Sequence, residues 1–160
     1  MRISKAALIT FGTAVVSLAL VSCGGGGDNE SSTTQAQAPA QPSGGGSLTI
    51  NMSDYAFSPN DASANAGTVR ISTPNQGQLP HELVLFKTQK SPGSLPTLSN
   101  GEVDEEGLEA GGVDSPGEIE DVSPGKTKSA TLKLTPGRYV MICNLPGHYK
   151  QGMYGTLTVK

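Results

Sequence analysis

From residue 48 onward, apolar and polar residues alternate in short runs that are separated by turn-forming residues. A period of two is typical of β-strands with one buried face, and the intervening Pro, Gly and Asn residues favour turns. Six runs carry the pattern most clearly, and this succession of short strands and turns predicts an all-β, Greek-key sandwich or barrel of about seven to eight strands. The six runs are residues 48–52, 68–72, 81–86, 129–134, 138–143 and 154–159.

One long stretch, between Lys90 and Lys126, interrupts this pattern because it holds nine carboxylates and no cation. Its Asn-Gly and Gly-Gly pairs favour a loop, although residues 102–109 could form one or two helical turns. Such a charge run is either a solvated face or a docking surface for a basic redox partner, and it lacks the ligand spacing of a calcium hand. The carboxylates are Glu102, Asp104, Glu105, Glu106, Glu109, Asp114, Glu118, Glu120 and Asp121.

The amino-terminal segment has the layout of an export signal. Arg2 and Lys5 precede an apolar stretch at residues 6–20, which runs into Leu20-Val21-Ser22-Cys23 and then into glycines. A membrane span needs about 20 apolar residues and usually has charged flanks, so a transmembrane helix is the weaker interpretation. Leu-Val-Ser-Cys resembles the bacterial lipobox, which implies a signal peptide at residues 1–22 and lipidation of Cys23. Ordinary cleavage that leaves a free thiol is the alternative.

Residues 23–47 consist mainly of Gly, Ser, Thr, Gln, Ala and Pro, so we expect a flexible linker that ties the lipid anchor to a domain at residues 48–160. Acyl chains would hold the protein at a bacterial membrane, on the periplasmic or cell-surface side. Without its signal peptide the chain keeps 9 Lys and Arg against 14 Asp and Glu, a net charge of −5. This acidic balance makes nucleic acid an unexpected partner.

The candidate chemistry lies in four residues. Cys143, His148 and Met153 follow one another at intervals of five, and His81 begins a predicted strand; His81 and His148 are the only histidines of the chain. Two imidazoles, one thiolate and a weak thioether form the ligand set of an electron-transfer copper site. Zinc can use two His and one Cys as well, and each residue taken alone could serve packing instead. The joint pattern favours one copper that cycles between Cu(I) and Cu(II).

Gly-x-Tyr-x-x-x-Cys followed by Cys-x4-His-x4-Met resembles the cupredoxins, the plastocyanin and azurin superfamily, with the loop spacing of rusticyanin. The resemblance covers most of residues 48–160 and implies that His81, Cys143, His148 and Met153 bind copper. It further implies a corner pinned by the Tyr139 hydroxyl, a turn at Asn75 before the first ligand, and a backbone N–H of Glu82 that donates to the Cys143 sulfur. The Glu82 carboxylate is expected to be solvated. An apolar electron-transfer patch is implied at Leu145, Pro146 and Gly147, with Asn144 beside it and Tyr149 at its rim.

These features predict an electron carrier rather than an enzyme. Two histidines cannot build a second copper site, His-Glu-x-x-His is incomplete, and no nucleophile elbow occurs. The expected partners are a protein electron donor and acceptor, which would be basic if the acidic stretch is a docking surface, and no small-molecule substrate is expected. A copper-delivery protein without a carrier role is the alternative, although a closed thiolate site favours retention of the metal.

Overall fold

The computed structural model describes residues 45–160, so the signal peptide, Cys23 and the linker up to residue 44 lie outside the described range. The described chain contains ten strands, one short α-helix and one 3-10 turn. Its first strand begins at Gly45, three residues before the expected boundary at Leu48. Within residues 45–160 the structure has no helix that is both long and apolar enough to cross a membrane.

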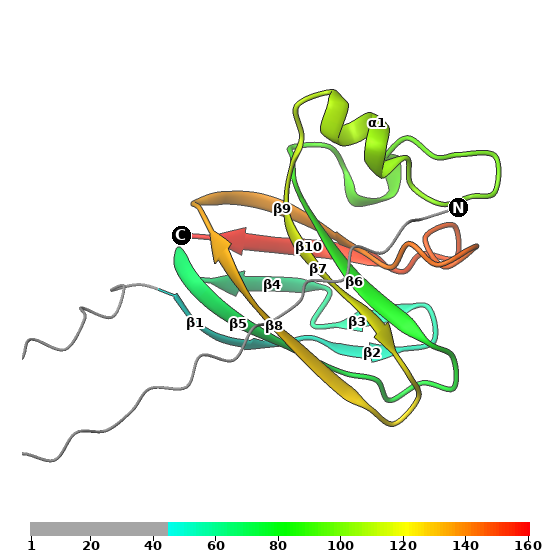
Figure 1. The fold of residues 1–160 in the computed structure, drawn as a ribbon, viewed down its shortest axis with the longest axis horizontal. Helices are drawn as coiled ribbons and strands as arrows, with labels where there is room; N and C mark the ends of the chain where they lie inside the picture. Colours follow the sequence, from blue (N-terminus) through cyan, green and yellow to red (C-terminus); the bar gives the residue numbers. More distant parts are fainter. Residues whose placement is uncertain (1–44) are drawn as a thin grey trace, which may run out of the picture. The chain divides into compact units, whose positions relative to one another are not determined.

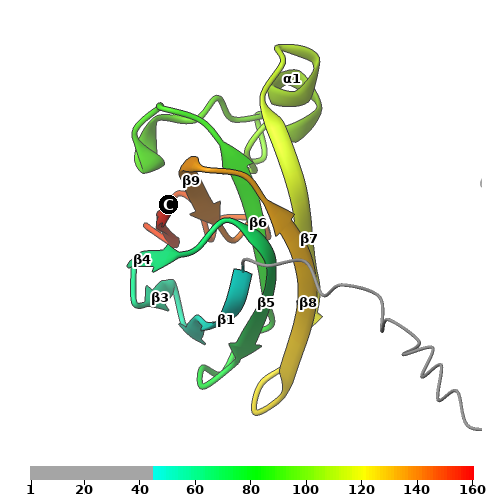
Figure 2. The same ribbon diagram turned by 90° about the vertical axis from the view of Figure 1, so that its left-hand side faces the viewer.

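Two sheets face one another and form a β-sandwich (Figures 1 and 2). Neighbouring strands are antiparallel except for β1 with β5 and β4 with β10, which are parallel. The smaller sheet has the order β1 (Gly45–Thr49), β5 (Gly67–Pro74) and β8 (Thr127–Leu134). The larger sheet has the order β4 (Asp61–Ala64), β10 (Tyr154–Val159), β9 (Gly137–Ile142), β6 (His81–Lys87) and β7 (Asp114–Val122). Two further strands, β2 (Asn51–Ser53) and β3 (Ala56–Ser58), form a separate hairpin. The all-β sandwich predicted from the alternating pattern is confirmed.

The main core lies between the two sheets. Alternate residues of each strand point inward, among them Ile71 of β5, Leu85 of β6 and Leu157 of β10, all fully buried. Met52 and Met141 are fully buried in this core as well.

Tyr139 pins the corner between β8 and β9. Its buried hydroxyl donates to the carbonyl of Thr135 at 2.9 Å and accepts from the Thr135 N–H at 3.1 Å. The expected tyrosine corner is therefore present, and it fixes the start of the strand that leads to Cys143.

A second apolar cluster covers the outer face of the larger sheet. The segment between β6 and β7 contains the 3-10 turn η1 (Pro92–Ser94) and helix α1 (Glu105–Ala110), whose N-terminus is capped by Asp104. This segment, which we call the insertion, packs its buried apolar side chains onto β6 and β9. Both faces of these strands are thus buried, which explains why their sequences read as continuous apolar runs. The cluster consists of Val84, Phe86, Leu95, Val103, Leu108, Val140, Ile142 and Tyr149.

The strand count of seven to eight was too low, because β3, β4 and β7 were not anticipated. The strand β7 occupies residues 114–122, inside the acidic stretch that was expected to form a loop or short helix. It is an edge strand that buries only Ile119 and Val122 fully and turns its acidic side chains outward. Charged side chains are common on edge strands because they oppose pairing with other chains, and here they mask the strand pattern.

Packing of the insertion can be tested with two leucines. Leu108 is 4% exposed within the second cluster, whereas Leu98 is 47% exposed. Leu108→Ala is expected to lower the free energy of unfolding of the apoprotein by about 2–5 kcal/mol in urea titrations, because it leaves a cavity. Leu98→Ala should change it by no more than about 0.5 kcal/mol. Equal effects of the two substitutions would contradict a packed insertion.

Candidate metal centre

Strand pairing brings the candidate ligands to one end of the sandwich. His81 is the first residue of β6, and Cys143 directly follows the last residue of β9. The two strands are antiparallel neighbours, with Val84 opposite Ile142. The start of β6 therefore lies beside the loop that leaves β9, although 62 residues separate His81 from Cys143 in the sequence.

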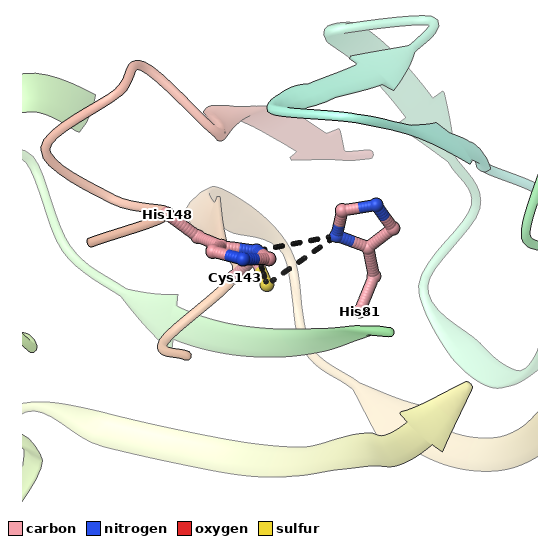
Figure 3. Close-up of side chains that lie close together, drawn as sticks. All are labelled: His81, Cys143 and His148. Atoms are coloured by element: carbon pink, nitrogen blue, oxygen red, sulfur yellow. Dashed lines mark hydrogen bonds between the residues drawn. The ribbon is translucent and has the colours of Figure 1, made fainter. Parts of the chain in front are cut away.

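Three ligand atoms converge in a buried space (Figure 3). The Nδ1 atoms of His81 and His148 lie 3.3 Å apart, and the Cys143 sulfur lies 4.0 Å from His81 Nδ1 and 3.3 Å from His148 Nδ1. A trigonal metal bonded at about 2.0–2.3 Å to nitrogen and sulfur would separate such atoms by roughly 3.5–3.8 Å. The observed distances bracket this range, so the three side chains fit one metal ion.

Met153 closes the loop that carries the other ligands. Its side chain is fully buried in the same core cluster as Cys143. The Cys143 N–H donates to the Met153 carbonyl at 3.1 Å, and the Met153 N–H donates to the His148 carbonyl at 3.1 Å. Backbone hydrogen bonds thus join all three ligand residues of the loop.

The Cys143 thiol lies in an apolar environment with two backbone donors. Burial raises its pKa to about 11, while hydrogen bonds from the N–H groups of Leu145 and Glu82 act in the opposite direction. The metal-free protein therefore keeps a thiol at neutral pH. A metal ion must displace this proton on binding, because the thiolate is the ligand form.

The expectation of a solvated Glu82 carboxylate was wrong. This side chain is half-buried, and its Oε1 accepts the backbone N–H of Asn144 at 2.8 Å. Burial raises its pKa to about 7 despite that hydrogen bond, and the negative charges of Glu105, Glu118 and Glu120 raise it further. Glu82, which follows the ligand His81, therefore holds the backbone of Asn144, which follows the ligand Cys143.

Asn144 connects the ligand loop to the insertion. Its Nδ2 donates to the Val103 carbonyl at 3.1 Å and to Glu105 Oε1 at 2.6 Å, while its Oδ1 accepts the Val103 N–H. Burial raises the pKa of the Glu105 carboxyl, and the Asn144 hydrogen bond opposes that rise. The acidic insertion is therefore fastened to the residue next to Cys143.

Asn75 shapes the turn before His81, as the sequence resemblance implies. Its side chain is 2% exposed and donates to the carbonyls of Leu79 and Val122, each at 2.8 Å. Its Oδ1 accepts the Gly77 N–H at 2.9 Å. The turn is thereby tied to the end of β7.

The residues implied to form the electron-transfer patch lie in the ligand loop. Pro146 is exposed, Leu145 is half-buried, and Gly147 has the positive φ of 83° that the turn requires. Tyr149 does not lie at the rim of this patch: it is 5% exposed and donates its hydroxyl hydrogen to the Pro92 carbonyl at 2.7 Å. Its ring belongs to the second apolar cluster, because the insertion covers it.

Two residues near the site were not predicted. Tyr55 lies edge-on against His148, with ring centroids 5.2 Å apart, and Asp54 Oδ1 lies 3.3 Å from His81 Nε2. Both belong to the turn between the three-residue strands β2 and β3. Strands this short give no periodic signal, and nothing local in the sequence links the turn to the ligands.

The sequence matches the profile of the copper binding proteins of the plastocyanin/azurin family over residues 45–160. The chain belongs to this family. It is a cupredoxin in which His81, Cys143, His148 and Met153 are arranged as a type 1 copper site.

Individual relatives agree with this membership. The chain is 30% identical over 139 residues to the copper-resistant cuproprotein CopI of Pseudomonas aeruginosa, an alignment that covers 71% of this chain and 76% of CopI. A shorter match of 39 residues, 49% identical, joins 24% of the chain to 17% of auracyanin-B of Chloroflexus aurantiacus.

Solved structures share the fold. Reduced auracyanin of Roseiflexus castenholzii superposes with a TM-score of 0.56 at 24% identity, and the match covers 71% of this chain and 96% of that one. An azurin of Methylomonas sp. strain J superposes with a TM-score of 0.52 at 21% identity, covering 71% of this chain and 97% of the azurin. At such identities the superpositions establish the cupredoxin fold, while the ligand arrangement comes from the chain's own residues.

Proposed function

We propose that this cupredoxin carries single electrons between protein partners outside the cytoplasm while a lipid at Cys23 holds it at a membrane. Copper held by the imidazoles of His81 and His148, the Cys143 thiolate and the Met153 thioether would supply a Cu(I)/Cu(II) couple, whose potential would depend on the thioether and on hydrogen bonds at the sulfur. The observation that carries the proposal is the buried convergence of the ligand atoms of Cys143, His81 and His148.

A ligand loop that is held firmly by hydrogen bonds suits electron transfer. Backbone hydrogen bonds close the ligand loop, and Asn144 fastens it to the insertion and to Glu82. Ligands held in this way move little when the charge of the metal changes, so the reorganisation that slows electron transfer stays small. The same closure opposes release of the metal.

The ligand loop also offers a route to the surface. His148 is 8% exposed, and Pro146 on the same loop is exposed. We infer that electrons enter and leave through His148 beside residues 145–147, where weak apolar contacts allow short-lived encounters. With a mature charge of −5, the protein would meet basic donors and acceptors faster at low ionic strength.

Copper handling is the second candidate, favoured by the 30% identity with the copper-resistant cuproprotein CopI. Such a role needs copper binding but no electron exchange with a partner. Carrier and delivery proteins differ in whether the metal stays bound, and this difference can be measured.

A redox titration combined with a copper-transfer assay separates the two candidates. The carrier role predicts reversible one-electron reduction and oxidation of the copper-loaded protein over repeated cycles, with the metal retained in the presence of a copper-free acceptor protein or chelator of moderate affinity. A matched Met153→Leu variant keeps a buried apolar side chain but removes the thioether, and it should shift the potential while still cycling. Transfer of most of the copper to the acceptor in either oxidation state would instead support delivery.

The proposed anchor is tested by membrane fractionation of cells that express the full chain. Cys23→Ala should move the protein from the membrane fraction to the soluble fraction, because the acyl chains are lost. Cys143→Ser is the matched control, since it removes the other thiol and should remain with the membrane. Retention of the Cys23→Ala protein in the membrane would exclude lipidation as the tether.

A further inference from the structure

Asp54 is held behind the first histidine ligand. It lies in the turn between β2 and β3, and its Oδ1 accepts the backbone N–H groups of Gln78 at 2.9 Å and Leu79 at 3.1 Å. The same oxygen lies 3.3 Å from Nε2 of His81. The Asp54 carboxylate of the β2–β3 turn thus contacts both the turn that precedes β6 and His81, the first residue of β6.

The turn before His81 is built to receive this carboxylate. A Cβ at Gly77 would lie 2.3 Å from Asp54 Oδ1, so only glycine leaves room for it. The side chain of Asn75 fixes the same turn by accepting the Gly77 N–H. The hydrogen bond from the Leu79 N–H is the main cause that holds the pKa of Asp54 below its ordinary value. Burial opposes this effect, and the Gln78 N–H and His81 support it.

The two nitrogens of His81 face different groups. Nδ1 points to the Cys143 sulfur and to His148 Nδ1 (Figure 3). Nε2 lies 3.3 Å from Asp54 Oδ1. A neutral imidazole carries one proton, and the hydrogen bond made by one nitrogen decides whether the other has a free lone pair. An ionised carboxylate only accepts hydrogen bonds, so it selects the tautomer with the proton on Nε2.

We propose that Asp54 is a positioning residue that fixes the Nε2–H tautomer and the ring orientation of His81, leaving the Nδ1 lone pair directed at copper. When a metal-binding histidine donates its other ring N–H to a carboxylate, its imidazole becomes a stronger electron donor to the metal. Asp54 therefore strengthens binding of Cu(II) and lowers the reduction potential. The proposal rests on the assignment of His81 as a copper ligand. Its predicted effect on the reduction potential also rests on the proposed electron-carrier role, whereas the predicted tautomer does not.

The tautomer is measured in the metal-free protein by ¹⁵N NMR of the histidine side chains. In the native protein we expect the His81 proton on Nε2 and an unprotonated Nδ1 under conditions where the ring is neutral. Asp54→Ala should yield a mixture of tautomers, whereas Asp54→Asn keeps an oxygen acceptor and should retain the Nε2–H form. A native protein with the His81 proton on Nδ1 would overturn the proposal without any variant being needed.

Competition titrations with Cu(II) provide the second readout. Asp54→Ala should weaken Cu(II) binding about tenfold to hundredfold and raise the reduction potential. Asp54→Asn should have a smaller effect of the same sign. Asp114→Asn, which removes the same charge from an exposed position on β7, should match the native protein.

The two readouts separate failure of this proposal from failure of the proposed function. Native tautomer and native Cu(II) affinity in Asp54→Ala would overturn the role of Asp54 and leave the copper carrier intact. Copper binding without reversible electron exchange would overturn the carrier role, and the tautomer measurement would still decide the role of Asp54.

Discussion

The hydrogen-bonded pairing of β6 with β9 is the constraint on which the site depends. It sets the start of one strand beside the end of the other, so His81 meets the loop that carries the remaining ligands. Burial of two imidazoles and a thiol costs free energy, which their mutual contacts and the backbone N–H donors to sulfur offset in part. Within residues 45–160 no buried side-chain nitrogen or oxygen lacks a hydrogen-bond partner. Strand pairing and these hydrogen bonds therefore hold the ligand atoms of His81, Cys143 and His148 together at one buried place.

The insertion links the surface charge of the protein to its metal centre. Its apolar side packs on the outer face of the larger sheet, and its polar side reaches Asn144 through Val103 and Glu105. Glu82 completes this arrangement from β6 by accepting the N–H of Asn144. A segment that reads as a charged loop is thus part of the support of the ligand loop. This support explains how a loop can hold three ligands in place.

The sequence predicted the features that show as a local pattern, such as the strands, and those that show as scarce residue types, such as the metal ligands. Alternation in the strands on either side of the core revealed the sandwich, and the scarcity of histidine made His81 and His148 conspicuous. Contacts between segments far apart in the chain could not be predicted. Asp54 reaches His81 only through the packing of two turns, and Tyr149 is covered only because the insertion folds over it. Glu82 looked solvated because its partner is a backbone N–H 62 residues away.

The visible absorption spectrum of the copper-loaded, oxidised protein, compared with that of Cys143→Ser, tests the central claim most directly. Ligation by the Cys143 thiolate predicts one copper per chain and an intense thiolate-to-copper absorption band, because thiolate electron density mixes with Cu(II). Cys143→Ser should lose this band entirely, while Cys23→Ser keeps it. A native protein without the band, or a Cys143→Ser protein that retains it in full, would contradict the assignment of the metal centre.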